Sequence, residues 1–246
     1  MGKVTVISSG KGGTGKSTVA VGLAVAFSSI GNKVLLVDFN QGTRSLNSLV
    51  APDGDVVFDL NDVINNKVNL ATAVCCSDVY ENVFLLSASL SVAELDCNAV
   101  EKFFMAVSEK YDNVIVDIQQ NFIVEVKSAF PFGTDVLLVS ECNRVSLEAC
   151  NNLLKNLEVC EKLKYKLILN KFNRNKILKF KLNIDKMIDI AGVSLIGIIP
   201  YDKYLENIYL AKKRKRINKG RVKYAFSRIA ARLIGLVYPL PKIKDI

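Results

Sequence analysis

Seven short runs rich in Val, Ile and Leu recur along the chain, and longer segments with helical spacing separate them. The runs are Val4–Ser8, Lys33–Asp38, Val83–Ser87, Val114–Ile118, Asp135–Ser140, Lys166–Asn170 and Ser194–Ile199. Most of them are continuously apolar rather than alternating between apolar and polar residues. Continuous apolar runs of this length are typical of strands that are buried on both faces, as in parallel sheets.

The segments between these runs have the spacing of amphipathic helices, most clearly Ser17–Ile30, Val92–Lys110, Ser146–Cys160 and Val222–Leu236. The last segment places six apolar residues on one helical face: Val222, Ala225, Phe226, Ile229, Leu233 and Leu236. Strands that alternate with helices over the whole chain predict an α/β fold, a doubly wound and mostly parallel sheet with helices on both faces. Ligands bind at the carboxyl ends of the strands in such sheets, so chemistry is expected just after each strand.

The length and composition favour one domain. A chain of 246 residues, of which 50% are hydrophobic, can bury a large core. It has only 5 Pro, and no Ser/Gly-rich linker or repeat divides it, so we expect residues 1–246 to form a single domain. The first residues lack the pattern of a secretory signal, and the apolar stretch Val19–Phe27 is far shorter than the ~20 residues of a membrane span. We therefore expect a cytoplasmic protein.

The cysteine and histidine content excludes several kinds of site. The 6 Cys include no C-x-x-C pair, and the chain has no His, so zinc and iron–sulfur sites lack their usual ligand spacing. We expect buried thiols instead. Without His, a Ser-His or Cys-His nucleophilic mechanism is excluded.

The formal net charge of +9 is concentrated in one segment near the C-terminus. Between Ala211 and Arg232 the chain has no Asp or Glu, and the rest of the chain is close to neutral. The basic residues of this segment are Lys212, Lys213, Arg214, Lys215, Arg216, Lys219, Arg221, Lys223, Arg228 and Arg232. The first five are adjacent cations that repel one another. They indicate either a solvated basic surface or contact with a polyanion: DNA, anionic lipid or an acidic protein.

A phosphate-binding loop follows the first predicted strand. Residues 9–18 read Ser-Gly-Lys-Gly-Gly-Thr-Gly-Lys-Ser-Thr and contain the pattern G-x-x-x-x-G-K-[ST] between a predicted strand and a predicted helix. The glycines allow the backbone to wrap with its N–H groups pointing inward, and the following helix adds its positive N-terminal end. We expect Lys16 to reach the β- and γ-phosphates of ATP and the Ser17 hydroxyl to ligate Mg²⁺.

A second lysine in this loop, Lys11, makes it similar to the deviant Walker A loop of the MinD/ParA family of P-loop ATPases. Later segments agree in order with other elements of that family: 35–47 with switch I, 114–117 with Walker B, 167–171 with the strand that reads adenine, and 197–202 with a late G-x-I-P-x-D element. The chain resembles MinD more than ParA, because Gly42 and Arg44 stand where ParA proteins have Pro-Gln-Gly.

The resemblance implies a homodimer that sandwiches two ATP molecules with Mg²⁺ and hydrolyses them slowly. It also implies that Lys11 crosses the interface to phosphates held by the partner subunit, so that dimerisation gates hydrolysis. The residues implied in hydrolysis are Lys11, Lys16, Asp38 and Asn40, and the implied Mg²⁺ ligands are Ser17, Asp38 and Asp117. The residues implied in ATP binding are Gly10, Lys11, Gly12, Gly13, Thr14, Gly15, Lys16, Ser17, Thr18, Asn170, Pro200 and Asp202.

The chain departs from the family pattern at three places. Asn40 replaces an Asp that places the attacking water, and an amide can orient water but neither takes up a proton nor carries charge. Gln119 and Asn121 replace the Pro and Gly of switch II. Pro239 and Pro241 near the C-terminus exclude the basic amphipathic helix with which MinD proteins bind membranes.

Three functions follow from these patterns. The first is a MinD-like, ATP-controlled dimerising switch that positions a cellular structure, with a partner protein that activates it or recruits it to a membrane, pole or nucleoid. The second is a nucleotide-sensing scaffold with little hydrolysis, because of Asn40, Gln119 and Asn121. The third is a ParA-like, DNA-associated partition ATPase, suggested by the basic residues Lys212, Lys213, Arg214, Lys215 and Arg216. The same motifs serve in positioning septa, flagella, pili and chromosomes.

Overall fold

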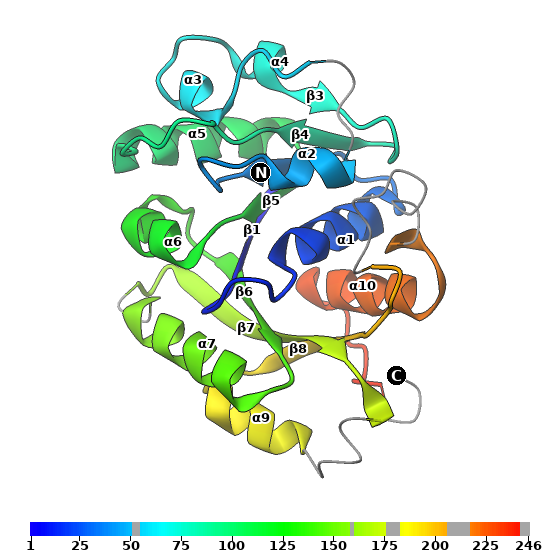
Figure 1. The fold of residues 1–246 in the computed structure, drawn as a ribbon. Helices are drawn as coiled ribbons and strands as arrows, with labels where there is room; N and C mark the ends of the chain where they lie inside the picture. The colour runs from blue at the N-terminus through cyan, green and yellow to red at the C-terminus, as the bar shows by residue number, and fades with distance from the viewer. Residues whose placement is uncertain (51–54, 158–159, 176–182, 206–216, 242–246) are drawn as a thin grey trace.

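The computed structural model describes residues 1–50, 55–157, 160–175, 183–205 and 217–241, and these contain one mostly parallel sheet of eight strands (Figure 1). The strand order is β3-β4-β2-β5-β1-β6-β7-β8. The strands are β1 Lys3–Ser8, β2 Val34–Asp38, β3 Cys75–Cys76, β4 Val83–Leu86, β5 Asn113–Asp117, β6 Thr134–Glu141, β7 Leu163–Phe172 and β8 Leu195–Pro200. Every neighbouring pair is parallel except β3 with β4.

Helices cover both faces of this sheet (Figure 1). One face carries α1 Lys16–Ser28, α2 Ser45–Val50 and α10 Gly220–Leu233. The other carries α3 Leu60–Ile64, α4 Leu70–Ala73, α5 Cys97–Lys110, α6 Gln120–Val126, the 3₁₀ turn η1 Lys127–Ala129, α7 Arg144–Leu157, and α9 Ile184–Ala191 beside α7. Side chains alternate between the two cores along each strand, so Leu36 packs toward α1 while Leu35 and Val37 pack toward α5. The predicted doubly wound α/β fold is confirmed.

All seven predicted strands and all four predicted helices are present, with ends shifted by a few residues. The largest shift is in α5, which begins at Cys97 rather than Val92. Asp96 is the N-cap of α5, because its carboxylate accepts hydrogen bonds from the backbone N–H groups of Asn98 and Ala99. The two-residue strand β3 and the short helices α2, α3, α4, α6 and α9 were not predicted, because four to eight residues rarely give a readable period.

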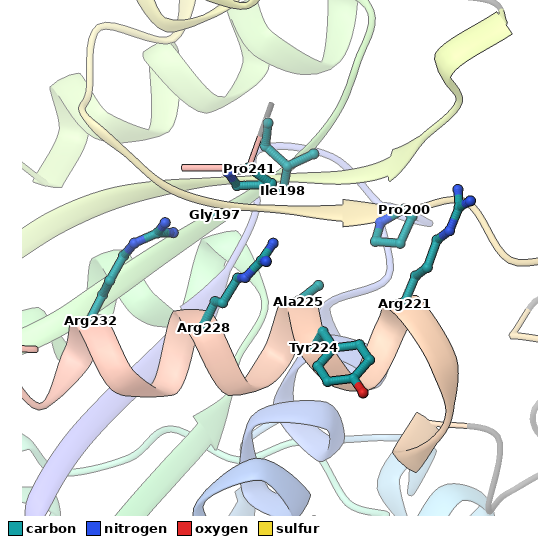
Figure 2. A pocket seen from close by; sticks show the side chains of 9 residues that line it. All are labelled: Gly197, Ile198, Pro200, Arg221, Tyr224, Ala225, Arg228, Arg232 and Pro241. Atoms are coloured by element: carbon teal, nitrogen blue, oxygen red, sulfur yellow. The ribbon is translucent and has the colours of Figure 1, made fainter. Parts of the chain in front are cut away.

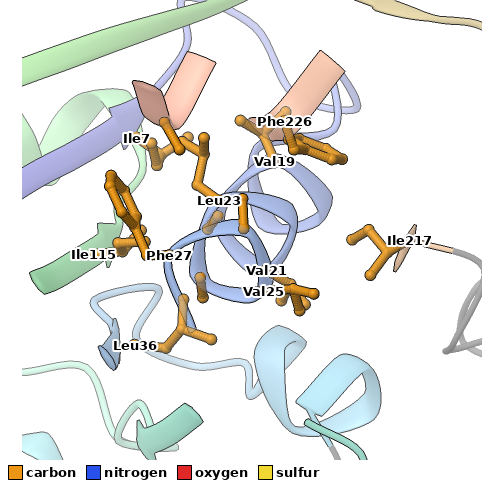
Figure 3. Packing of buried hydrophobic residues seen from close by; sticks show 14 of the residues in the cluster. Ile7, Val19, Val21, Leu23, Val25, Phe27, Leu36, Ile115, Ile217 and Phe226 are labelled. Atoms are coloured by element: carbon orange, nitrogen blue, oxygen red, sulfur yellow. The ribbon is translucent and has the colours of Figure 1, made fainter. Parts of the chain in front are cut away.

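Helix α1 is surrounded by other elements rather than lying on the surface. Every residue from Val19 to Phe27 is buried, on all sides of the helix. The sheet covers one side, and α2 and α10 cover the others, as the packing around Leu23 shows (Figure 3). At Gly22 a Cβ atom would overlap the ring of Phe226, so α1 and α10 approach closely only because this position has no side chain.

The apolar face predicted for α10 is confirmed for five of its six residues, and the prediction for Leu236 is wrong. The helix ends at Leu233, and Gly235 follows with a φ of 88°, so Leu236 turns away and is 53% exposed. Residues 234–241 contain no helix. The basic residues Lys212–Arg216 lie outside the described residues. Within the described ranges, no helix has the length and hydropathy needed to cross a bilayer.

The expectation of buried thiols holds for only one cysteine. All 6 Cys are free thiols, but Cys150 alone is buried, Cys76 is exposed, and the other four are half-buried. Burial raises the pKa of the Cys142 thiol to about 12, and the nearby Glu141 carboxylate adds to the shift. This thiol is therefore un-ionised at neutral pH and a poor nucleophile.

The α1–α10 contact gives the first prediction. Replacing the buried ring by Phe226→Ala leaves a cavity against Gly22 and should lower the free energy of unfolding by about 3–5 kcal/mol. The matched change Tyr224→Ala removes a 66% exposed ring from the same helix and should cost less than about 0.5 kcal/mol. Urea unfolding of both variants provides the measurement. Equal losses would show that burial against α1 is not what stabilises α10.

Candidate functional site

A glycine-rich loop connects β1 to α1 at the carboxyl edge of the sheet. Gly13 and Gly15 adopt positive φ angles of 76° and 95°, which glycine adopts without strain. Gly15 is also the N-cap of α1, and no side chain caps the helix there. The first N–H groups of α1 therefore remain available to an anion that the loop surrounds.

The loop is packed closely against its neighbours. A Cβ atom at Gly10 would overlap the backbone carbonyl of Ala149 in α7, and one at Gly15 would overlap the amide of Asn170 at the end of β7. Glycine at these two positions thus allows α7 and β7 to approach the loop from one side. The loop conformation is fixed by tertiary packing as well as by its own backbone freedom.

Two buried acids lie side by side next to the loop. Asp38 ends β2 and Asp117 ends β5, and these residues are direct partners in the parallel register of the two strands. Both residues are 0% exposed. The Ser17 hydroxyl, from the first turn of α1, donates to Asp117 Oδ2 at 2.5 Å and lies 3.3 Å from the Ser45 hydroxyl. The structure thus brings together the three residues predicted as Mg²⁺ ligands.

Burial raises the pKa of both carboxyl groups. For Asp38 burial is the larger cause and the neighbouring Asp117 carboxylate the second, and together they raise its pKa from 3.8 to about 7. For Asp117 burial raises the pKa to about 6, although the Ser17 hydroxyl and the Lys16 charge act in the opposite direction. Asp117 Oδ1 is buried and accepts no hydrogen bond from any residue that the structure describes. Two buried carboxyl groups, one with an orphan oxygen, fit a hard cation such as Mg²⁺.

Asn40 is buried between these acids. Its Nδ2 donates to Asp38 Oδ1 at 2.8 Å and to the Asp117 backbone oxygen at 3.3 Å, and its own backbone N–H also donates to Asp38 Oδ1. Asn40 Oδ1 has no partner among the described residues and is buried. The amide therefore acts as a donor that holds Asp38 in place, a role that a carboxylate at this position cannot fill unless it is protonated.

A cleft of about 400 Å³ opens above the loop and the acid pair. Its lining residues come from three separate segments: Ser9, Lys11, Gly12, Lys16, Ser17, Asn40, Thr43, Ser45, Gln119, Gln120 and Asn121. The loop, the segment after β2 and the segment after β5 therefore meet at one place. Lys11 is exposed at the rim, while Lys16 is half-buried.

A second cleft of about 590 Å³ lies at the ends of β7 and β8. Pro200 and Asp202 line it, together with Phe172, Asn173, Arg174, Asn175, Tyr201, Gly220, Arg221 and Val222. Asn170 does not line this cleft; its side chain is buried and donates from Nδ2 to the Thr14 carbonyl at 2.7 Å. The residue predicted to read adenine thus contacts the phosphate loop directly.

Lys171, which the sequence analysis did not single out, also contacts the loop. Its ammonium group donates to the Gly13 carbonyl at 2.8 Å and to Glu141 Oε1 at 2.7 Å. Side chains of consecutive strand residues normally point to opposite faces. Here Lys171 has a φ of 53° and the β7–β8 register is irregular, so Asn170 and Lys171 both reach the loop. The sequence gives no signal for this positive φ at a lysine.

The family model described as the CobQ/CobB/MinD/ParA nucleotide binding domain matches residues 5–214. The chain belongs to this family. The predicted resemblance to MinD/ParA proteins is therefore confirmed.

The similarity to MinD proteins extends over the whole chain. The septum site-determining protein MinD of Bacillus subtilis is 26% identical over an alignment 254 residues long, gaps included, which covers 100% of this chain and 94% of that protein. The MinC:MinD cell division protein complex of Aquifex aeolicus contains a chain with a TM-score of 0.85 and 27% identity, covering 98% of this chain and 99% of that one. MinD of Pyrococcus horikoshii, solved with Mg-ADP, is 24% identical with a TM-score of 0.77 over 96% and 97% of the two chains, which shows a shared fold.

The CobQ/CobB/MinD/ParA domain also has side chains that connect the segment after β2 to the segments that follow β4 and precede α3. Arg44 donates from Nε to the Ala88 carbonyl at 3.0 Å and lies 3.7 Å from the Asp59 carboxylate. Gln41 Oε1 accepts from the Ala93 backbone N–H at 2.7 Å. Arg44 enters the prediction only as part of the family pattern, because contacts with residues 15 and 44 positions away are not visible in spacing.

The Lys171 contact gives the second prediction. Lys171→Met removes the hydrogen bond to the Gly13 carbonyl of the loop and the one to Glu141. The loop should therefore lose order, and the affinity for MgADP should fall about tenfold. Lys164→Met removes an exposed charge from the same strand and should leave the affinity unchanged. Titration calorimetry measures both. Wild-type affinity in Lys171→Met would show that the loop holds its shape without this lysine.

Proposed function

We propose that this chain is a MinD-like switch that binds MgATP, dimerises in the ATP state and hydrolyses ATP slowly while it helps to position a cellular structure. The observation that carries the proposal is the cleft in which the phosphate loop meets the segments after β2 and β5. The buried acid pair lies behind it and is joined to it by Ser17 and Asn40. Family membership and the whole-chain similarity to MinD proteins support the same conclusion.

The phosphates would lie in the loop at the start of α1. Backbone N–H groups of residues 10–18 would surround them, and Lys16 would neutralise charge on the β- and γ-phosphates. Ser17, Asp38 and Asp117 would hold Mg²⁺, which when bound shields the phosphate charge. The Ser17 hydroxyl, which now donates to Asp117, would turn its oxygen toward the cation. Asn170, Pro200 and Asp202 would form the nucleoside side of the site.

Lys11 would complete the site from the other subunit. It lines the cleft and is exposed to solvent, so an approaching subunit could contact it. Asn170 and Lys171 hold the loop at Thr14 and Gly13, three and two residues from Lys11. An exposed lysine at this place would neutralise charge on phosphates of a second subunit only once that subunit approaches, which would couple hydrolysis to dimerisation.

Asn40 supports a slow reaction. The amide would orient water through its free Oδ1 but cannot accept a proton at neutral pH. A second candidate function therefore remains, a nucleotide-sensing scaffold with little hydrolysis, and the observation that favours it is the engagement of the Asn40 amide with Asp38.

A partner protein completes the proposal. The Aquifex aeolicus relative was solved in a complex with MinC, and we propose that this chain is likewise recruited or activated by a partner at its site of action. The single-domain, cytoplasmic interpretation is part of this proposal. A ParA-like contact with DNA through Lys212–Arg216 stays a prediction, since these residues lie outside the described ranges.

The dimer gives the third prediction. Light scattering should show a dimer with a non-hydrolysable ATP analogue and a monomer with ADP. Lys11→Ala should weaken the dimer or its turnover at least about tenfold while it retains ATP binding, because its charge acts across the interface. Lys16→Ala serves as the reference that loses ATP binding itself. A wild-type mass that is monomeric with both nucleotides, at high protein concentration and with any partner present, would contradict the sandwich.

Asn40 gives the fourth prediction. Asn40→Asp restores an acidic acceptor near the water and should raise kcat about tenfold. The same change removes a donor to Asp38 and adds a third carboxyl group, so it should lower stability without Mg²⁺ by about 1–3 kcal/mol, and MgADP should restore it. Steady-state ATP turnover and thermal unfolding measure the two effects, with Asn47→Asp in α2 as the control. Equal turnover of wild type and Asn40→Asp would show that Asn40 does not limit hydrolysis.

A further inference from the structure

The groove between α10 and the edge strand β8 is lined by three arginines of one helix face. Arg221, Arg228 and Arg232 are seven and four residues apart, which places them on the same side of α10. Figure 2 shows the side chains of Arg228 and Arg232 extending from α10 toward β8. The groove encloses about 100 Å³, and its other walls are Gly197, Ile198, Pro200, Tyr224, Ala225 and Pro241.

Arg232 lines the groove, and within the part of the chain that the structure describes its hydrogen-bond partners are all backbone carbonyls. Its Nε donates to the Tyr238 carbonyl at 2.9 Å, its Nη2 to the Pro239 carbonyl at 2.7 Å, and its Nη1 to the Ile196 carbonyl. These hydrogen bonds hold the segment after α10, and Pro241 of that segment lies beside Ile198 and lines the groove (Figure 2). Carbonyl groups satisfy the donors but leave the positive charge of Arg232 uncompensated.

Arg228 lies in the middle of the groove, half-buried, without a hydrogen bond or ion pair to any residue in the described ranges. No acid is among the described residues that line the groove, and the chain has no Asp or Glu between Glu206 and Asp245. The pKa of Arg232 is lowered by burial and, second, by the charge of Arg228, so the two guanidinium groups repel each other. An anion between them would replace this repulsion by attraction.

We propose that this groove is a second anion-binding site that takes one terminal phosphate group, either of a soluble phosphate compound or of a phospholipid headgroup. A planar guanidinium binds phosphate through two parallel hydrogen bonds, and Arg228 has its donors free for this. The enclosed volume suits a single phosphate rather than a whole nucleotide.

This site is separate from the phosphate loop. Three strand spacings separate β8 from β1, which the loop follows, and at about 4.8 Å each this is about 14 Å. Phosphates held by the loop therefore cannot reach Arg228. Pro200 and Arg221 border both the groove and the cleft that contains Asp202, so an occupied groove would contact the same residues as the nucleoside side of the site.

The test compares Arg228→Gln with Lys223→Gln, which removes the same charge from an exposed position of α10 outside the groove. Saturating MgADP keeps inorganic phosphate out of the phosphate loop in every sample. In one arm, inorganic phosphate replaces chloride at constant ionic strength and the Tm is measured. In the other arm, co-sedimentation is measured with phosphatidylcholine vesicles that contain phosphatidic acid, and with vesicles that lack it.

Arg228→Gln should bind MgADP normally and should have at least the wild-type Tm in chloride, because it removes a repulsive charge. For wild type and Lys223→Gln, the Tm should rise with phosphate concentration. If Arg228→Gln needs at least about tenfold more phosphate for the same rise in Tm, the ligand is a soluble phosphate. Vesicle binding that depends on phosphatidic acid and on Arg228 supports the lipid headgroup. Arg228→Lys keeps the charge but loses the two-pronged geometry and should give an intermediate response in the arm that responds. Equal losses in Arg228→Gln and Lys223→Gln, or no response of wild type in either arm, overturn the proposal.

Discussion

The burial of two carboxyl groups at the ends of neighbouring strands is the constraint on which the rest of the site depends. Asp38 and Asp117 are in register on β2 and β5, are fully buried, and have raised pKa values. The free energy of this arrangement is unfavourable unless donors or a cation surround the pair. The chain supplies the Ser17 hydroxyl, the Asn40 amide and the backbone N–H of Leu46. Each of these groups belongs to a segment that also lines the cleft or adjoins it. The hydrogen bonds that stabilise the two acids therefore also fix the position of the cleft walls.

The same arrangement explains why residues 40–44, which follow β2, are held at both ends. Asn40 is bound to the acids, whereas Gln41 and Arg44 are bound to the segment after β4 and to Asp59, the N-cap of α3. A cation that attracts Asp38 would compete with the hydrogen bonds that now orient it. Arg44, which contacts the N-cap of α3, is only four residues after Asn40. A shift of Asn40 would therefore also displace the contact with α3. These contacts thus link the position of the acid pair to that of α3, on the face of the sheet that α5 covers.

The sequence predicts the scaffold well because the signals are local and redundant. Most central strands contain a continuous apolar run, such as Val136–Val139, and the phosphate loop has its glycines, lysine and serine within ten residues. Asp38 and Asp117 follow their strands directly, so their meeting at one edge follows from parallel topology. The sequence does not predict Lys171 on the loop, because that depends on a positive φ and on Glu141 from another strand. It also misplaces Leu236, since helical spacing continues past the point where Gly235 ends the helix.

The arginine-rich face of α10 has a consequence for how copies of this chain can associate. Strand β8 is the last strand of the sheet, and an uncovered last strand invites pairing with the sheet of another molecule. Arg232 donates a hydrogen bond to the Ile196 carbonyl on this strand, so this carbonyl is already paired. Arg228 adds a positive charge in the same groove, and the same residue of a second copy paired at this edge would repel it. Growth of the sheet from molecule to molecule is therefore disfavoured at this edge. The edge of the sheet is thus a poor surface for self-association, and a proposed dimer that forms across bound nucleotide would use a different surface of the chain.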